Sequence, residues 1–394
     1  MTQEETGVFS CVSLVGCYAE GFGQEVDMAD VIYEIYGEDA HEMTYALLAA
    51  ANAADRIPAG AGVALKPNLV LAAPADNGAI THPGVLSGCI AYLNDHGIHD
   101  ISIMESSWVG AQTDSSFHAS GYDRVCEEYG VPFYDLKKDP VVVVDTPFRP
   151  MELCRRAYEA DFLIDLPVLK GHCQTRMTCA LKNLKGCIPD KEKRRFHSEG
   201  LFRPIAALAA VLKPDLVVVD SICGDLDFEE GGNPIRTNRM YLGWDALLAD
   251  AYGASLMGLG VDEVGYLRLA EEWGAGSLDI ASAEIKRLNK PQESNAYPSR
   301  SAVVDRLTGN VLAKSACSAC FASLVRALYI QESRGKRYDE PIAIGQEWQG
   351  VSFEGLGIGR CAGGAAYPVK GCPPSAQDII EAIAAVHDQG FKTK

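Results

Sequence analysis

The sequence lacks two features of membrane and exported proteins. It has no apolar run of membrane-spanning length, and no basic amino-terminal segment followed by an apolar stretch. We therefore expect a cytoplasmic protein that does not insert into a membrane. Basic residues are also few, with 35 Lys and Arg against 53 Asp and Glu and a net charge of -18. This balance argues against general nucleic-acid binding and against electrostatic docking on a membrane surface.

Two further patterns are missing. Cysteine is too sparse for a secreted disulfide scaffold, at 13 of 394 residues, so most cysteines are expected to be thiols in a reducing compartment. No Gly-x-Gly-x-x-Gly follows an expected strand, so a dinucleotide site is not predicted. The chain is long enough for a large core and two or three domains.

Short apolar runs alternate with helical patterns through the middle of the chain. This alternation predicts an α/β fold with a mainly parallel sheet and helices on both faces. The expected strands are 8–19, 62–65, 98–104, 131–134, 141–145, 160–165 and 215–220, and the expected helices are 44–54, 83–95, 116–129, 150–157, 203–212, 244–257 and 375–387. We expect residues 21–41 to be irregular or helical.

Three segments are expected to form the domains. Residues 1–60 supply a strand and a helical segment that pack on the main domain, residues 61–305 form the α/β domain, and residues 306–394 form a small cysteine-rich module. A long loop at 165–203 interrupts the main domain, and its local excess of Lys and Arg indicates a site for a small anion. Lys182 and Lys185 lie three residues apart and could share a helical face, although a solvated charged helix would look the same.

Ligands of open α/β sheets collect beyond the carboxyl ends of the strands. Polar residues that follow the expected strands or lie in the basic loop are therefore the candidates for anion binding: Lys66, Asn68, Lys170, His172, Lys182, Asn183 and Lys185. The candidate proton donors and acceptors are His82, Glu105 and His197. A structural, hydrogen-bonded role is the alternative for each histidine, and an ordinary strand-end carboxylate is the alternative for Glu105.

Four cysteines near the carboxyl terminus lie at turns. Cys317 and Cys320 form one Cys-x-x-Cys turn, Cys361 follows a glycine-rich run, and Cys372 precedes two prolines. Four thiolates, two of them from such a turn, are typical of a 4Fe-4S cluster. Tetrahedral zinc is the runner-up, although zinc ribbons usually have two such turns, and buried cysteines without a ligand are the third reading. Residues 369–374 resemble the last-ligand region of the small subunits of nickel–iron hydrogenases and respiratory complex I.

Several separated motifs resemble the domain-of-unknown-function 362 (DUF362) family. They are residues 65–70, 81–84, 160–172, 180–187, His197 and 216–220, and the resemblance extends over about residues 62–265. It implies an iron–sulfur cluster-binding protein, since family members frequently carry such a module, often a two-cluster ferredoxin insert. This chain departs from that form because it has no Cys-x-x-Cys-x-x-Cys run, so the resemblance implies one cluster. A fainter likeness, at the level of the fold, links the family to the nickel-pincer lactate racemase.

Together these features predict an oxygen-sensitive oxidoreductase of anaerobic metabolism, in which one 4Fe-4S cluster exchanges electrons with a small anionic molecule. One alternative is a racemase-like or isomerase-like enzyme with a structural cluster and an additional, unidentified cofactor at His82 and His172. Another is an electron carrier or cluster-maturation factor without its own substrate. A redox partner protein and a homodimer are both compatible with the sequence.

Overall fold

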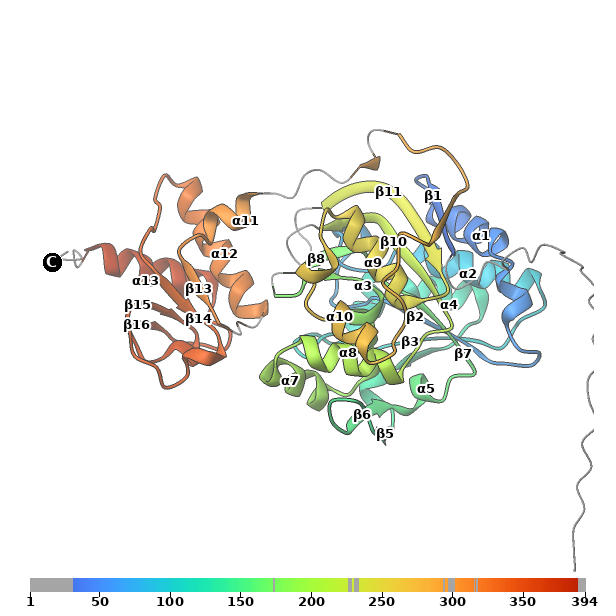
Figure 1. Cartoon of the computed structure of the whole chain (residues 1–394), viewed down its shortest axis with the longest axis horizontal. Coiled ribbons are helices and arrows are strands. Elements are labelled where there is room, and N and C mark those ends of the chain that lie inside the picture. Colours follow the sequence, from blue (N-terminus) through green and yellow to red (C-terminus); the bar gives the residue numbers. More distant parts are fainter. Residues whose placement is uncertain are drawn as a thin grey trace, which may run out of the picture.

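The computed structural model describes residues 31–388 apart from 173, 226–228, 230–233, 293–294, 297–301, 315 and 317. Its largest element is an eight-stranded sheet (Figure 1). In spatial order the strands are β12 (Glu284–Arg287), β1 (Val31–Tyr36), β11 (Pro234–Gly243), β10 (Leu216–Asp225), β7 (Phe162–Leu166), β2 (Val63–Pro67), β3 (Ile101–Glu105) and β4 (Phe133–Asp135). The strands from β10 to β4 are parallel, and β11 is antiparallel to both of its neighbours.

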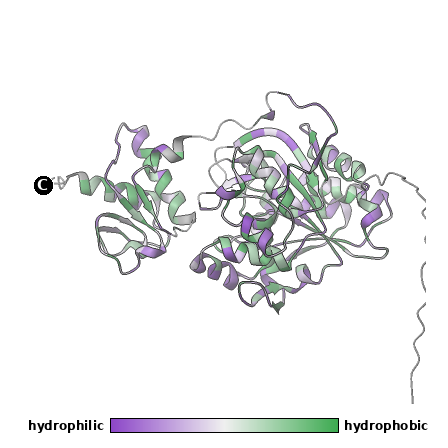
Figure 2. Ribbon diagram, viewed as in Figure 1, coloured by the Kyte–Doolittle hydropathy of each residue, from purple (hydrophilic) through white to green (hydrophobic). Residues whose placement is uncertain are grey.

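Helices cover both faces of this sheet, because alternate strand side chains point into two separate cores. Ala64 and Leu163 belong to one core, whereas their neighbours Leu65 and Ile164 belong to the other. The first core is covered by α5 (Arg155–Tyr158), α6 (Ala180–Asn183), α7 (Asp190–Glu199), α8 (Phe202–Val211), α9 (Ala246–Leu256) and α10 (Leu267–Glu272). The second is covered by α1 (Ala40–Ala50), α2 (Pro83–Asp95), α3 (Thr113–Ser120) and α4 (Tyr122–Tyr129). Figure 2 shows the hydrophobic strands between these layers.

Two short hairpins and several 3₁₀ turns complete the main domain. The hairpins pair β5 (Val141–Val144) with β6 (Met151–Cys154), and β8 (Lys170–His172) with β9 (Arg176–Thr178). The turns are η2 (Ala53–Arg56), η3 (Ala75–Asn77), η4 (Leu136–Lys138), η5 (Leu184–Cys187) and η6 (Val261–Glu263). No helix among the described residues is long and apolar enough to cross a bilayer.

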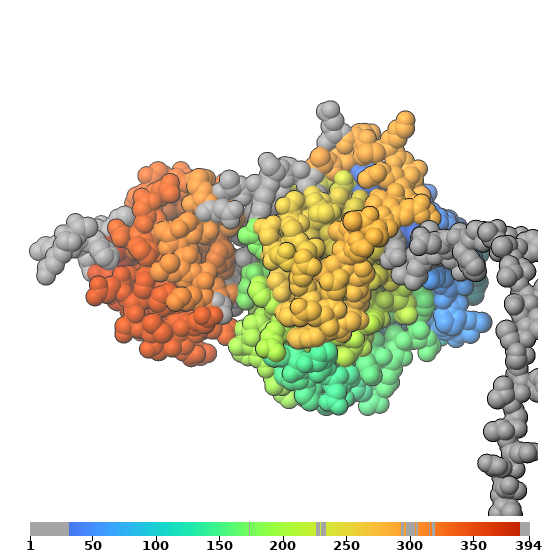
Figure 3. Space-filling model, in the orientation of Figure 1, coloured from blue at the N-terminus to red at the C-terminus, as the bar shows by residue number. Residues whose placement is uncertain are grey.

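The C-terminal lobe has a core of its own and a second, four-stranded parallel sheet. Its strands are β13 (Val311–Ala313), β14 (Ile342–Ile344), β15 (Phe353–Ile358) and β16 (Ala365–Val369), its helices are α11 (Ala302–Leu307), α12 (Ser318–Ser333) and α13 (Ala376–Asp388), and its 3₁₀ turns are η8 (Gln346–Trp348) and η9 (Arg360–Ala362). Figure 3 shows the lobe as a separate mass beside the main domain. A hydrogen bond from Gln346 Nε2 to the His197 carbonyl connects the two.

The α/β class with a large, mostly parallel sheet is therefore correct, and several local expectations are wrong. Residues 31–36 are a strand rather than irregular or helical chain, and residues 151–154 are a strand where a helix was expected. The helix expected at 116–129 is broken at Gly121, which has a φ of 82°. The expected long loop at 165–203 contains β8, β9 and three helical segments. The strand expected at 8–19 lies outside the described residues.

Candidate functional site

A cavity of about 280 Å³ lies beyond the carboxyl ends of β2 and β3. Asn68 follows β2, and Glu105 is the last residue of β3. The loop after Glu105 lines the cavity. Residues of α6, η5 and α7 close it from the main domain, and Cys372 and Pro373 close it from the C-terminal lobe. Its charged lining residues are Glu105, Lys182, Lys185, Lys193, Arg194 and Glu229. The cavity therefore carries an excess of cationic side chains in an acidic protein.

The deepest charged pair at this site is Lys66 with Glu105. Lys66 Nζ lies 2.6 Å from Glu105 Oε2, and the side chains are 0% and 3% exposed. Burial alone would lower the pKa of Lys66, but the neighbouring acidic groups, Glu105 first, together outweigh it and raise this pKa. Glu105 also accepts a hydrogen bond from the Ser106 N–H at 2.6 Å. A Cβ on Gly186 would lie 1.8 Å from Glu105 Oε1, so only glycine leaves room for the carboxylate there.

Beside this pair, three hydrogen bonds run in one direction through two amides. Lys170 Nζ donates to Asn68 Oδ1 at 3.1 Å, Asn68 Nδ2 donates to Asn183 Oδ1 at 2.8 Å, and Asn183 Nδ2 donates to Asp165 Oδ1 at 2.7 Å. The donor–acceptor order fixes both amide orientations. Burial raises the pKa of Asp165 to about 7, while Lys66 acts to lower it. This series of hydrogen bonds holds the side chains of Asn68 and Asn183 at the cavity wall in one orientation.

Glu229 connects the basic residues of α6 and β8. Its carboxylate lies 2.5 Å from Lys182 Nζ and 3.0 Å from His172 Nε2. Burial would raise the pKa of Glu229, but Lys182 and His172 hold it well below its usual range. His172 Nδ1 accepts from the backbone N–H groups of Gln174 and Thr175, so Nε2 carries the proton that points at Glu229. Burial, and then Lys182, lower the pKa of His172 to about 4, so this ring is neutral.

Lys185 differs from the other lysines of the cavity. Burial, and then the charge of Lys182, lower its pKa to about 7, and within the described residues no hydrogen bond or ion pair holds its Nζ. The positive charge of Lys185, and then burial, lower the pKa of His197 to about 3. His197 Nδ1 is buried and has no hydrogen-bond partner in the part of the chain that the structure describes. Lys185 therefore has a pKa at neutral pH and an amine without an acceptor of its own among the described residues.

Lys193 supports the loop that follows β3 rather than facing a ligand. Its Nζ donates to the Ser106 and Ser107 carbonyls at 3.0 and 2.7 Å, and to Ser106 Oγ at 2.6 Å. Burial lowers its pKa to about 8, partly offset by Glu105. Sequence reasoning missed Lys193, Arg194, Glu229 and Trp108 as cavity residues. For Trp108 the sequence did offer a signal, because it comes directly after Glu105-Ser106-Ser107, the polar residues at the end of an expected strand.

His82 is not among the residues that line the cavity. It precedes α2, and both its backbone N–H and its Nδ1 lie within 2.8 Å of Asp220 Oδ2. The helix start that would attract an anion thus binds a carboxylate of the protein itself. Burial would lower the pKa of His82, but Asp220 and then Asp76 raise it. Lys66, Lys170 and His172 also lie behind the lining, whereas Asn68, Glu105, Lys182, Asn183, Lys185 and His197 are part of it.

The C-terminal cysteines follow strand ends of the lobe. Cys361 lies in η9 after β15, Cys372 follows β16, and Cys320 is in the first turn of α12, the helix after β13. The segments around Cys361 and Cys372 are joined by a hydrogen bond from the Arg360 N–H to the Gly371 carbonyl. A Cβ on Gly359 would lie 3.3 Å from Cys320 Sγ. Three cysteine-bearing segments therefore meet at one edge of the four-stranded sheet.

Cys317 lies outside the described residues, so the structure does not place the fourth thiol. Among the residues that it does describe, no three His, Cys, Asp or Glu side chains are close enough together to hold a metal ion. Cys320 is buried, Cys361 is half-buried and Cys372 is exposed. The donor type fits an iron–sulfur cluster, and Cys317, three residues before Cys320, is needed to complete the set.

Comparison with known proteins supports the family resemblance over the main domain. A family model described as "Domain of unknown function (DUF362)" matches residues 63–255. The thylakoid-associated protein sll1697 of Synechocystis sp. (strain ATCC 27184 / PCC 6803 / Kazusa) is 27% identical over 199 residues, or 49% of this chain. That match spans 60% of the length of the relative. The cavity lysines lie inside the matched region, and the four C-terminal cysteines lie outside it.

A solved structure also shows a distant likeness. The lactate racemase apoprotein from Thermoanaerobacterium thermosaccharolyticum is 12% identical, with a TM-score of 0.41, and the match covers 62% of this chain and 60% of that one.

Proposed function

We propose that this protein is an iron–sulfur oxidoreductase that binds a small anion in the cavity between its main domain and its C-terminal lobe. One 4Fe-4S cluster would be held by Cys317, Cys320, Cys361 and Cys372. When bound, the cluster would supply a one-electron donor or acceptor next to the cavity. Sensitivity to oxygen and a place in anaerobic metabolism would follow from a cluster so near an open cavity.

The proposal rests chiefly on one observation, which is that the two predicted sites share a cavity. Cys372 and Pro373 of the lobe line the same space as Lys182 and Lys185 of the main domain. Electron transfer requires a donor and an acceptor to approach closely, and this arrangement would satisfy that requirement without a large movement of the lobe. The strand-end positions of the cysteines give separate support, because parallel strands deliver the residues after their carboxyl ends to one edge.

Within the cavity, the residues of this chain divide the work of binding and proton transfer. Lys182 and Arg194 line the cavity with basic side chains that would attract the anion. Lys185, whose pKa is lowered to about 7 by burial and by Lys182, is suited to give or accept a proton near neutral pH. Glu105 is tied to Lys66 and to the Ser106 N–H, so it would help to shape the cavity instead of moving a proton.

The test is metal analysis of protein purified without air. We expect about four iron and four acid-labile sulfide per chain, with a paramagnetic signal after reduction. Replacing Cys372→Ser removes a proposed ligand at the cavity and should cause loss of most of the iron, while Cys126→Ser, a half-buried cysteine of α4, should leave the content unchanged. Equimolar zinc without sulfide would favour the tetrahedral zinc reading. Iron that survives the Cys372 substitution would contradict the ligand assignment.

A further inference from the structure

The loop that follows β3 places an exposed tryptophan on the cavity wall. Trp108 is 41% exposed and lines the cavity together with Val109. Its indole lies over Gly110, where a Cβ would come within 2.3 Å of two ring carbons. The backbone N–H of Trp108 also donates to the Val70 carbonyl at 3.1 Å, which ties it to the segment after β2. Glycine at position 110 therefore permits the ring to lie close against the loop.

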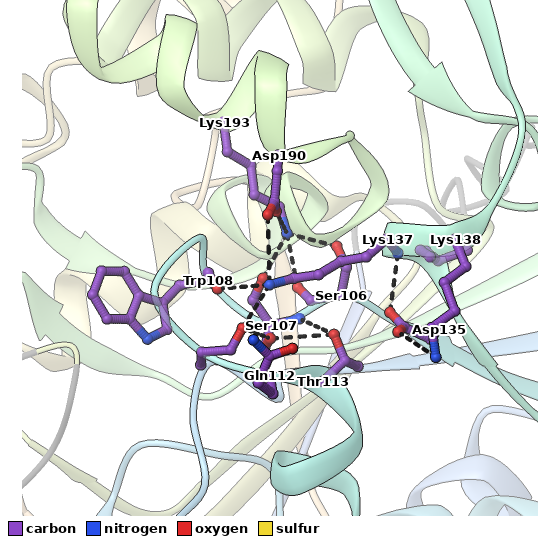
Figure 4. Close-up of polar contacts among 12 residues, drawn as sticks. Ser106, Ser107, Trp108, Gln112, Thr113, Asp135, Lys137, Lys138, Asp190 and Lys193 are labelled. Atoms are coloured by element: carbon purple, nitrogen blue, oxygen red, sulfur yellow. Dashed lines mark hydrogen bonds and ion pairs between the residues drawn. The ribbon is translucent and has the colours of Figure 1, made fainter.

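Two lysines from other elements hold this loop in place (Figure 4). Lys137 Nζ donates to the Trp108 and Ala111 carbonyls at 3.0 and 2.7 Å. Lys193 Nζ binds the Ser106 and Ser107 carbonyls on the other side of the tryptophan. Asp190 lies 3.6 Å from Lys137 Nζ and 3.8 Å from Lys193 Nζ, so it provides a carboxylate for both ammonium groups.

A single exposed apolar side chain is normal on a protein surface and needs no special role. Trp108 differs because its backbone is anchored on both sides by partly or wholly buried charges, and because it lines a cavity. Anchoring of this kind lowers the entropy lost when a ring stacks on the indole. Apolar groups adjoin it in the same cavity, namely Leu69, Val70, Val109 and Pro373. The cavity thus combines an apolar surface with the cationic groups Lys182, Lys185 and Arg194.

From this combination we infer that the ligand is an aromatic anion with a single ring or two fused rings. Its carboxylate or phosphate would lie at Lys185 and Lys182, and its ring would stack on Trp108. The volume of about 280 Å³ lies just below the usual range for ligand pockets, which excludes enclosure of a dinucleotide. This inference names the substrate class of the proposed oxidoreductase, and to that extent it depends on the proposed function. Binding of the ring by Trp108 does not depend on the cluster.

The experiment compares a flat ligand with its saturated counterpart. The affinities of 2-naphthoate and decahydro-2-naphthoate are measured by titration calorimetry on the intact protein, with 2-naphthyl phosphate as a second flat anion. Stacking on an aromatic side chain is worth enough for a preference of about tenfold for the flat carboxylate in the wild type. Tighter binding of the naphthyl phosphate would assign a phosphate group to the ligand, and tighter binding of the naphthoate a carboxylate.

Variants identify the residues responsible for the preference. Trp108→Leu should abolish the preference for the flat ring, Trp108→Phe should keep most of it, and Lys185→Met should weaken both carboxylates equally. Tyr158→Leu removes an aromatic side chain of similar exposure, 43%, away from the cavity and should change nothing. Equal affinities in the wild type, no binding of either carboxylate, or a preference that survives Trp108→Leu would overturn the inference.

Metal analysis of the same samples separates the two proposals. A ring preference in protein without iron and sulfide would contradict the proposed function and leave the inference standing. A cluster in protein without the ring preference would do the reverse.

Discussion

The main domain and the C-terminal lobe both contribute lining residues to one cavity, and these residues are held in place in different ways. In the main domain Lys66 and Glu105 are buried as a pair, and the buried Lys182 pairs with Glu229, which is 24% exposed. In the lobe, Cys361 and Cys372 lie half-buried and exposed at turns that follow the strands of a small sheet. The main-domain wall is therefore fixed by interactions within the protein, whereas the lobe would gain its final arrangement from a bound metal cluster.

This contrast has a physical origin in desolvation. A buried charge is tolerated only with a partner, so each lysine behind the cavity needs its own acceptor, and removal of one partner leaves the other unpaired. An uncharged thiol loses much less solvation free energy on burial than a charged group, so it needs no partner, and it binds a metal as the thiolate. The two regions should consequently respond to substitution in different ways.

The largest effect is expected from Lys66→Met. This substitution leaves the Glu105 carboxylate buried without its cation and should lower the free energy of unfolding of the main domain by about 3–5 kcal/mol. Lys191→Met provides the matched control, because Lys191 makes a similar 2.8 Å contact with Glu152 but is 75% exposed. That control should change the free energy of unfolding only slightly, because solvent screens an exposed ion pair. Denaturant unfolding measures both changes.

The double variant Lys66→Met/Glu105→Gln extends this test. It removes both charges, so it should recover part of the stability lost in the single variant. If Lys66→Met is as mild as Lys191→Met, the main-domain wall is not fixed by paired buried charges and the contrast with the lobe fails.

The second effect is a pH dependence of anion binding. Lys185 has its pKa lowered to about 7, so it is protonated below pH 7 and loses its charge as the pH rises through 7. If only the protonated amine holds the anion, affinity should fall about tenfold between pH 6 and pH 8. Isothermal titration with benzenesulfonate, which stays ionised throughout, measures this. The fall should reverse on returning to pH 6.

Lys185→Arg isolates the responsible group, because arginine stays charged over this range. The variant should lose most of the fall in affinity between pH 6 and pH 8. Among the neighbouring groups, His197 and Glu229 titrate well below this range. Asp165, whose pKa burial raises to about 7, and Lys193, whose pKa burial lowers to about 8, titrate within it. Both are unchanged in Lys185→Arg, so the pH dependence that this variant loses belongs to Lys185. A wild-type affinity that is constant from pH 6 to pH 8 would contradict the role of Lys185.

The sequence predicted those parts of the fold that depend on local patterns. The helix expected at 83–95 agrees with α2 because Pro83 marks its first turn. The expected helix at 150–157 failed because Met151–Cys154 pairs with β5, an antiparallel contact that no helical pattern in the segment reveals. The strand β1 was missed for a similar reason, since it is defined by pairing with β11 and β12, more than 200 residues away.

The candidate site shows the same division between local and distant information. Residues after strand ends, such as Asn68 and Glu105, could be selected from the sequence because parallel strands deliver them to one edge. The partners that set their chemistry could not, since Glu229 reaches Lys182 across 47 residues and Lys193 reaches Ser106 across 87. Trp108 could have been selected as the aromatic residue directly after Ser107, but its anchoring by Lys137 depends on the folded loop.

The smallest effect concerns the contact between the two regions. Gln346 of the lobe donates to the carbonyl of His197 in α7, and replacing it by alanine should cost only about 0.5–1.5 kcal/mol of docking free energy. Because each region has its own core, the main-domain unfolding transition should stay unchanged, while amide exchange at the last turn of α7 should become faster. Gln349→Ala, an exposed glutamine of the same lobe, should leave that exchange unaltered. If a variant at Gln346 destabilises the main domain as strongly as Lys66→Met, the lobe and the main domain unfold as one cooperative unit. The contrast between the two regions would then fail.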